Sequence, residues 1–380
     1  MNALRWLGAP SPGGLALPAA HPTAAHLYGP RGVCLDGPRL LVADTGNHRV
    51  LIWHSIPDSD HAPADVILGQ PSPTSEGPNV GGPRYGMNLP TSLAVVDGNL
   101  VVADAWNHRL LVWEGIPQRS GEAPSLVLGQ PDWESVAVNA GRPRDGSTWN
   151  WPFGFLVRGK QWLILDTGNR RVLGYQGMPL GQRCADWVLG QPDAHSGEEN
   201  RGAPAGPRSF RWPHGACEFS GHLWIVDAGN HRVLGWPAHL STDMDATHVL
   251  GQPDFHSNSE FVLAPQGPAR LRFPYSLATN SHWLAAADTA NNRVLCWRAS
   301  SAWPTAGRPA DYVFGQPDFF SNGENHWKSV THNSLCWPYG LAMNETTLAV
   351  ADSGNNRILL WQLPALPAAE TTHEESTLCV

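Results

Sequence analysis

The sequence predicts an all-β protein, a six-bladed β-propeller, and three observations support this fold class. A phrase that first reads VADTGNHRVLIW, from Val42, occurs in six copies at a spacing of about 61 residues. Each unit holds four short apolar runs of strand length, and helical spacing is absent over any useful length. The 39 glycines and 34 prolines are typical of many short elements joined by turns. Four antiparallel strands repeated six times form a propeller.

Four landmarks give the order of the strands within each unit. The innermost strand begins at a proline 14 residues before the aspartate of the phrase: Pro30, Pro90, Pro152, Pro213, Pro274 and Pro338. The second strand ends at that aspartate: Asp44, Asp104, Asp166, Asp227, Asp288 and Asp352. The third strand ends at an aromatic residue: Trp53, Trp113, Tyr175, Trp236, Trp297 and Trp361. The outer strand carries LGQP, or FGQP in the fifth copy, starting at Leu68, Leu128, Leu189, Leu250 and Phe314.

The second unit shows this order most plainly. Its four apolar runs lie near residues 92–96, 100–104, 109–113 and 126–129. The first two are joined by Asp97-Gly98-Asn99, a combination that favours a tight hairpin.

The sixth LGQP is displaced to the start of the chain, where Leu7 begins a degenerate copy. Residues 1–10 are therefore predicted to supply the outer strand of the last blade and to close the ring, which removes exposed sheet edges. Residues 1–361 then form a single propeller, and the Pro-, Ala- and Glu-rich residues 362–380 form a disordered tail. A cleaved signal peptide is not expected, because cleavage near Ala20 would remove the closing strand.

These residues resemble the NHL repeat, named for its Asn-His-Leu signature. The run D-x-G-N-H-R-[VL], preceded by P-x-G-[VL]-x and strand-forming residues, carries the resemblance over essentially residues 1–361. The resemblance implies a six-bladed propeller but leaves the activity open, because NHL propellers include RNA-binding, ubiquitin-ligase-associated and sensor domains and a peptidyl-hydroxyglycine lyase.

The Asp, Asn and Arg of the phrase are predicted to be structural, because a device present in every blade serves the fold and a catalytic group is needed once. Calcium binding by these turns is the alternative. The turn glycines, Gly46, Gly168, Gly229 and Gly354, are expected to supply positive φ. One letter of the phrase varies, and these residues are predicted to be exposed and dispensable: His48, His108, Arg170, His231, Asn292 and Asn356.

Charge and cysteine content exclude several classes of function. The net charge is −8 and only Lys160 and Lys328 are lysines, so neither nucleic acid nor an anionic membrane surface is an expected partner. No apolar run reaches the roughly 18 residues that span a bilayer. The six cysteines show no CxxC pair and are expected to be reduced and mostly buried, which favours a cytoplasmic location.

The loops that lead from one blade into the next are long, about 20 residues each, and share a face with the turns between strands two and three. Six such loops on a rigid ring make a natural recognition surface. Residues flanking each invariant proline are expected to ring the mouth of the central channel. Those predicted to hold an anionic or carboxylate-bearing ligand are Arg31, Arg211, His214, Arg272, Tyr275 and Tyr339.

We therefore expect a non-catalytic interaction or scaffolding module that binds a protein or peptide through the long-loop face, without a cofactor, a metal or assigned catalytic residues. A small anionic ligand is a further candidate. The alternative is a metal-dependent lyase or hydrolase-like enzyme at the channel mouth, with His214 joined by loop histidines. None of those histidines shows a metal-ligand spacing: His26, His195, His256, His326 and His332.

Trp106 stands where most copies have the turn glycine. An indole at a position of positive φ costs roughly 1 kcal/mol or more, which suggests a compensating role. The sequence predicts that Trp106 contacts the partner, and the competing interpretation is that it packs under a neighbouring loop.

Overall fold

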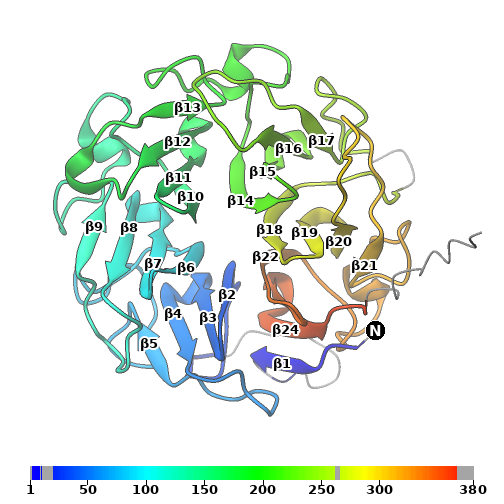
Figure 1. Ribbon diagram of the computed structural model, residues 1–380. Coiled ribbons are helices and arrows are strands. Elements are labelled where there is room, and N and C mark those ends of the chain that lie inside the picture. Colours follow the sequence, from blue (N-terminus) through cyan, green and yellow to red (C-terminus); the bar gives the residue numbers. More distant parts are fainter. Residues whose placement is uncertain (1, 9, 11–19, 262–265, 366–380) are drawn as a thin grey trace, which may run out of the picture.

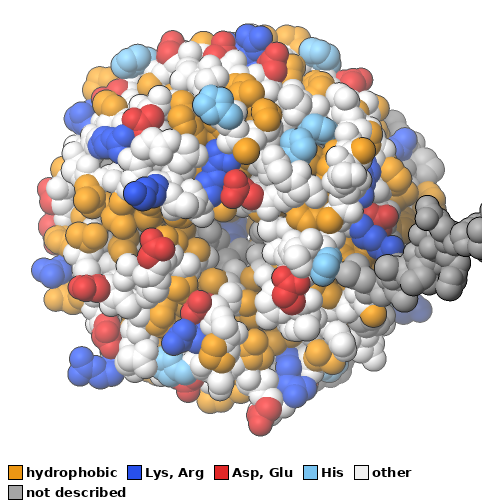
Figure 2. All heavy atoms as spheres, in the orientation of Figure 1, with side chains coloured by type: hydrophobic (Ala, Val, Ile, Leu, Met, Phe, Trp, Pro, Cys, Tyr) orange, Lys and Arg blue, Asp and Glu red, His pale blue; other side chains and the backbone are white. Residues whose placement is uncertain are grey.

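The computed structural model describes residues 2–8, 10, 20–261 and 266–365 of the chain. Six four-stranded antiparallel sheets surround a central channel as the blades of a propeller, which confirms the predicted fold class (Figure 1). The inner strands border the centre of the ring, and a hollow lies there in the space-filling view (Figure 2). The part of the chain described contains no helix long and apolar enough to cross a membrane.

The first five blades are continuous in sequence, each with its strands in order from the channel outwards. Blade one comprises β2 (Gly32–Asp36), β3 (Arg39–Asp44), β4 (Arg49–Trp53) and β5 (Val66–Leu68). Blade two comprises β6 (Ser92–Val96), β7 (Asn99–Asp104), β8 (Arg109–Trp113) and β9 (Leu126–Leu128). Blade three comprises β10 (Pro152–Arg158), β11 (Gln161–Asp166), β12 (Arg171–Gln176) and β13 (Trp187–Leu189). Blade four comprises β14 (Pro213–Phe219), β15 (His222–Asp227), β16 (Arg232–Pro237) and β17 (His248–Leu250). Blade five comprises β18 (Pro274–Thr279), β19 (Trp283–Asp288), β20 (Arg293–Arg298) and β21 (Tyr312–Phe314).

Blade six is built from both ends of the chain, as predicted. It comprises β22 (Pro338–Met343), β23 (Thr347–Asp352), β24 (Arg357–Gln362) and β1 (Arg5–Gly8). β1 pairs antiparallel with β24, and Leu7, opposite Ile358, is fully buried. β24 ends at Gln362 and Leu363 is buried, so the first residues of the predicted tail belong to the propeller. Residues 366–380 of that tail lie outside the described residues.

The core consists of six hydrophobic layers, each shared by two adjacent blades. Between blades one and two, for example, Leu41 and Val50 pack with Leu93, Val102 and Trp113. The aromatic residues that end the third strands are buried in these layers, as expected. Because every blade depends on both neighbours for its apolar contacts, ring closure completes the last layer, in which Leu7 packs beside residues of blades six and one.

The short turns between strands two and three are 3-10 helices. They are η2 (Thr45–Asn47), η3 (Ala105–Asn107), η5 (Thr167–Asn169), η8 (Ala228–Asn230), η9 (Thr289–Asn291) and η11 (Ser353–Asn355). The connections carry η4 (Val138–Gly141), η6 (Leu180–Gln182), η7 (Glu199–Gly202) and η10 (Glu324–Trp327).

The aspartate of each phrase organises its turn, as blade two shows. Oδ1 of Asp104 accepts the backbone N–H of Asn88 at 2.7 Å, and Oδ2 accepts bonds from Asn107 and from Nε of Arg109, both at 2.8 Å. Arg109 is fully buried and also donates to the Trp133 carbonyl in the loop that leaves its blade. Donors from the chain itself occupy both carboxylate oxygens, and the structural role predicted for Asp, Asn and Arg is confirmed.

The glutamine of LGQP fastens the outer strand to the same turn. Nε2 of Gln130 donates to the carbonyls of Asn107, at 3.1 Å, and Ala137, at 2.9 Å. The preceding Gly129 has a φ of 88°, which places the glutamine under the turn. The tetrapeptide therefore connects each of the first five blades with the long loop that follows it.

The predicted role of the turn glycines is wrong, and so is the role predicted for the variable letter. In all six turns the variable residue, and not the glycine, has the left-handed conformation, with φ between 53° and 55°. The glycine is required for space, since a Cβ on Gly46 would lie 2.6 Å from the Tyr28 carbonyl oxygen. Most of the variable residues are buried: His108, His231, Asn292 and Asn356 are between 3% and 7% exposed.

The variable residue connects its blade to the next one. Nδ1 of His108 accepts the backbone N–H of Trp151 at 3.0 Å, and Oδ1 of Asn292 accepts that of Trp337 at 2.8 Å. The same bond joins His48 to Leu89, His231 to Phe273 and Asn356 to Gly29. Arg170 is the exception, because its guanidinium donates to the carbonyl of Gly168 in its own turn. The inter-blade bond explains why five of the six variable letters are His or Asn.

Candidate binding site at the channel mouth

The residues that follow the invariant prolines line the channel and form a ring that we call the throat. Its members are Arg31, Thr91, Phe153, His214, Tyr275 and Tyr339. The innermost strand begins at the proline in blades three to six and two residues after it in blades one and two, and in every blade the residue that follows the proline lines the channel. The cavity they line has a volume of about 220 Å³.

Aromatic rings in the throat stack in an unbroken series. The ring centroids of Phe153 and His214 are 4.2 Å apart, and those of His214 and Tyr275 are 4.3 Å apart, with interplanar angles of 26° and 18°. Tyr339 continues the series at 4.5 Å from Tyr275. Thr91, on the remaining side, is buried and donates to the carbonyl of Phe153 at 2.7 Å. The throat is therefore lined by aromatic rings on one side and by the polar side chain of Thr91 on the other.

Arg31 completes this ring of side chains. Its guanidinium carbon lies 4.7 Å from the centroid of the Tyr339 ring and 5.9 Å from that of Phe153. The side chain is half-buried, and the described residues that line this cavity include no aspartate or glutamate. A guanidinium in contact with ring faces alone retains its hydrogen-bond donors for a ligand.

Two other titratable groups of the throat, His214 and Tyr275, remain uncharged at neutral pH. Burial, together with the nearby charge of Arg31, lowers the pKa of His214 to about 3. Burial and the neighbouring Tyr339 raise the pKa of Tyr275 to about 12. His214 is therefore a neutral imidazole, Tyr275 is a protonated phenol, and Arg31 provides the positive charge of the lining.

The structure places Arg211 and Arg272 outside the channel lining, away from the other four predicted ligand-binding residues. Residues two positions before the proline pack over the turn of their own blade, because their backbone N–H bonds to the buried aspartate. Arg211 pairs with Glu199 at 2.9 Å, and Arg272 with Glu260 at 3.2 Å. Their charges are balanced on the loop face.

Residues immediately before the prolines form a second ring above the throat, which we call the rim. Its members are Gly29, Leu89, Trp151, Trp212, Phe273 and Trp337. Leu89, Trp151, Phe273 and Trp337 have φ between 48° and 51°, a strained conformation for bulky side chains. Trp151 and Trp337 are 41% and 42% exposed. The rim was not predicted, although the sequence has a bulky apolar residue immediately before five of the six prolines, where a turn is expected.

Trp106 lies beside the rim and does not have the strained conformation expected for it. Its ring centroid is 5.0 Å from that of Trp151 and 6.4 Å from that of Phe153, and the side chain is half-buried. The backbone N–H of Trp106 still reaches the Asn88 carbonyl, at 3.2 Å. The indole thus packs against blade three, and its role as a partner contact stays a prediction.

The loop histidines named as possible metal ligands do not gather around His214. Three of them contact carbonyls of nearby loops: His195 that of Arg144, His256 that of Ala205 and His326 that of Gly315. His332 lies against Trp6 and Asp60. Within the described ranges, no three His, Cys, Asp or Glu side chains are grouped so that they could hold a metal ion.

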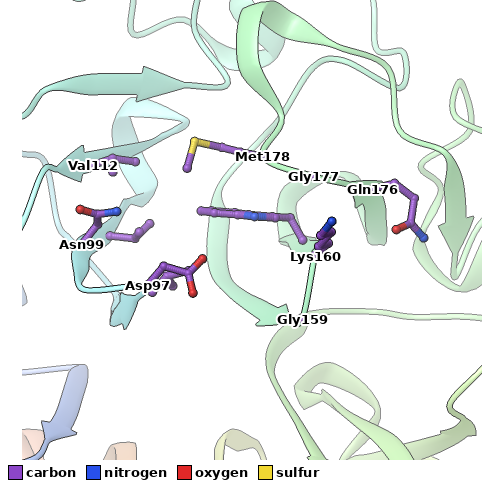
Figure 3. Close-up of a pocket in the computed structure, with 11 residues that line it drawn as sticks. Asp97, Asn99, Val112, Gly159, Lys160, Gln176, Gly177 and Met178 are labelled. Atoms are coloured by element: carbon purple, nitrogen blue, oxygen red, sulfur yellow. The ribbon is translucent and has the colours of Figure 1, made fainter.

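A second cavity, of about 380 Å³, lies between blades two and three outside the channel (Figure 3). Asp97 and Asn99 border it on one side, and Lys160 and Met178 on the other. Both charged residues are exposed, and they stand at hairpin tips that water solvates. The charged side chains of this cavity are therefore solvent-exposed, whereas Arg31 in the throat is half-buried.

Comparison with known proteins supports the repeat assignment. The model of the NHL repeat matches residues 27–53 and 87–113. No curated protein matches the chain. A streptogramin B lyase structure is 11% identical, with a TM-score of 0.46, over 91% of this chain and 96% of that one. A structure of virginiamycin B lyase from Staphylococcus aureus is 10% identical, with a TM-score of 0.45, over 90% and 98%.

Proposed function

We propose that the chain is an NHL-repeat β-propeller, since the NHL-repeat model matches residues 27–53 and 87–113 of its six-bladed ring, and that it is a non-catalytic interaction module. It binds a protein or peptide partner through the face that carries the long loops. Such a module acts as a scaffold or accessory subunit, and the ring holds the recognition surface rigid.

The distribution of exposed aromatic side chains is the observation that carries this proposal. Among the described residues, every large aromatic residue classed as exposed lies in a loop that leads into an inner strand. They are Tyr28, Tyr85, Trp151, Phe320, Trp327 and Trp337. Exposed aromatic residues are the usual anchors of protein interfaces, where Trp and Tyr are enriched. Trp327, at 78% exposed, is the most accessible of them.

The backbone that presents these residues also supports a binding role. Positive φ at Trp151 and Trp337 turns both side chains towards solvent, and each costs about 1–3 kcal/mol in strain. The inter-blade bonds from His108 and Asn292 hold the two residues in this conformation. A partner then meets a preorganised surface, which lowers the entropic cost of association.

Site-specific photo-cross-linking in cells of the source organism tests the proposal. A benzophenone amino acid is placed at Trp327 in one protein and at Lys160, which is exposed on the cavity between blades two and three, in another. We expect a discrete cross-linked species from the Trp327 position and none from the Lys160 position. Equal labelling from both positions would contradict the assignment of the long-loop face.

Matched variants separate the binding surface from general loss of apolar area. The double variant Phe320→Ser, Trp327→Gly should weaken capture of the cross-linked partner at least about tenfold, as expected for removal of anchor residues. The control, Leu126→Ser with Leu180→Ser, removes two exposed apolar side chains outside the long loops. It should leave capture unchanged.

The proposal includes a cytoplasmic location and a partner other than nucleic acid. Five described cysteines are free thiols, among them buried Cys217 and Cys296, which supports a reducing compartment. Acidic and basic side chains are interspersed over the face shown in Figure 2, whereas nucleic-acid binding requires a basic patch. Cell fractionation with immunoblotting tests the location.

A further inference from the structure

We propose that the throat is a binding site for a single carboxylate carried on a flat, apolar body. The guanidinium of Arg31 receives the carboxylate, and the rings of Phe153, His214, Tyr275 and Tyr339 enclose the body. This inference does not depend on the partner-binding proposal, because a free acid can enter the channel without a partner.

The state of Arg31 is the first argument. The repeat arginines are buried against aspartates, as in the 2.8 Å bond between Arg109 and Asp104. On the loop face, Arg211 and Arg272 are paired with glutamates. Among the described residues, the Arg31 guanidinium contacts the ring faces of Tyr339 and Phe153. In a protein of net charge −8, an arginine held at the channel axis without an acid is a ready anion receptor.

The state of His214 is the second argument. The side chain is 7% exposed, and its Nδ1 is buried without a hydrogen-bond partner. An unsatisfied buried nitrogen is costly and calls for an explanation. Because no acceptor is available to Nδ1, the neutral ring is best protonated on Nε2, which can then donate to a ligand. The imidazole is held in place by stacking between Phe153 and Tyr275.

The shape and charge of the throat select a monoanion. The fork of one guanidinium matches the geometry of a carboxylate, and the described residues of the lining include no second cation that could balance a dianion. The stacked rings leave flat faces that favour a planar or aromatic body. A cavity of about 220 Å³ admits a small acid, or the terminal residue of a peptide, and excludes a folded domain.

The experiment measures binding of benzoate to the full-length protein by isothermal titration calorimetry. Benzamide is the neutral isostere and phenyl phosphate the dianion of similar shape. To distinguish a free acid from a chain terminus, acetyl-Gly-Gly-Phe is measured as the carboxylate and as the amide. Each ligand is titrated into the wild type, Arg31→Gln, Tyr339→Phe and the control Arg84→Gln. Arg84 lies on a long loop beside Tyr85 and outside the throat, and melting temperatures check folding.

We expect benzoate to bind the wild type and Arg84→Gln equally. It should bind Arg31→Gln at least about tenfold more weakly, because a charge-assisted hydrogen bond is lost. Benzamide and phenyl phosphate should both bind more weakly than benzoate. Binding of the peptide acid but not the peptide amide would support the site and assign it to a chain terminus, whereas binding of benzoate alone would assign it to a free acid.

Three results would overturn the inference that the throat binds a small acid, and a fourth would overturn its assignment to a carboxylate. One is that benzoate and benzamide bind equally, and another is that Arg31→Gln leaves benzoate binding unchanged. The third is that neither benzoate nor the peptide acid binds the folded wild type. Tighter binding of phenyl phosphate than of benzoate would overturn the assignment to a carboxylate.

Discussion

At the residue scale, His108 and its counterparts join the blades through a single backbone N–H. The bond lies at the point where one turn ends and the next rim residue begins. Both members have left-handed backbone conformations, His108 with a φ of 55° and Trp151 with a φ of 50°. Asn and His tolerate this conformation better than most residues and carry an acceptor at the right distance. A single residue of the repeat therefore completes the turn of its own blade and bonds to the neighbouring blade.

Substitution of His108 tests this connection. His108→Ala should lower the free energy of unfolding by about 1–3 kcal/mol, the cost of a buried N–H without an acceptor, and His108→Asn should cost much less. Urea unfolding measures both. Arg170→Ala is the matched control, because Arg170 has the same backbone conformation but accepts no inter-blade bond. Equal losses in His108→Ala and Arg170→Ala would assign the effect to backbone strain alone.

The same histidines predict a pH dependence of stability. Burial lowers the pKa of His108 to about 4, and burial is also the main cause that lowers the pKa of His231 to about 4. The unfolded chain, with a histidine pKa near 6.5, then binds protons that the folded chain does not. Each histidine therefore contributes stability that is present above about pH 6.5 and is lost as the pH falls towards 4.

Urea unfolding between pH 7 and pH 4.5 measures this effect. The variant with His108→Asn and His231→Asn should lose less stability over this interval than the wild type, because Asn292 and Asn356 show that asparagine makes the same bond. The slope should differ by up to about 1.4 kcal/mol per pH unit for each histidine. Parallel pH profiles would refute the assignment of the inter-blade bonds to neutral imidazoles.

Trp106 requires a revised prediction. Strain at this position would have made Trp106→Gly neutral or stabilising, but the residue is unstrained and packs on Trp151 and Phe153. We now expect Trp106→Gly to lower the free energy of unfolding by about 1–3 kcal/mol, through lost burial and aromatic contacts. Calorimetric melting measures the loss. An unchanged melting temperature with weakened partner capture would return Trp106 to the set of partner contacts.

The sequence alone placed Arg31, His214, Tyr275 and Tyr339 at the channel, because residues at the start of a propeller's inner strands lie beside the axis. It misplaced Arg211 and Arg272, because their orientation depends on a bond between their own N–H and the buried carboxylate at the end of the neighbouring strand. Repetition reveals which positions matter, but it does not show the direction of a side chain in an irregular loop.

At the element scale, the landmarks predicted the position of every strand, although β2 and β6 begin two residues after the proline, and even the displaced β1 was located from a degenerate LGQP. Strand position is fixed by local periodicity and by the alternation of buried side chains. The aromatic rim was not predicted, because its exposure results from positive φ at Trp151 and Trp337, which no local propensity of tryptophan indicates. Long-range hydrogen bonds impose that conformation.

Removal of β1 tests the ring closure. Deletion of residues 1–8 should lower the melting temperature by several degrees and promote association, because β24 would become an exposed edge and the layer around Leu7 would lose its outer strand. Calorimetry and light scattering measure these effects. Arg5→Ala, which alters a partly exposed side chain of the same strand, is the control and should melt like the wild type. A truncated protein that also melts like the wild type would contradict closure by this strand.

At the scale of the whole molecule, the ring separates stability from recognition. The buried Asp–Arg pair occurs in all six blades, and the LGQP glutamine and the inter-blade bond each occur in five of the six repeats, whereas the throat and rim differ from blade to blade. Structural repetition leaves the positions around each invariant proline free to vary, so that Arg31 occurs once among four aromatic neighbours. A scaffold of repeated blades thus surrounds a channel whose lining side chains differ from blade to blade.

The most direct test of the central claim, that the throat on this axis binds a carboxylate, is a crystal structure of the protein soaked with 4-bromobenzoate. Anomalous scattering from bromine locates the ligand without assumptions about its pose. We predict a bromine peak in the channel, with the carboxylate within hydrogen-bond distance of the Arg31 guanidinium. A peak only in the cavity between Asp97 and Lys160, or no peak in the throat at saturating ligand, would contradict the account.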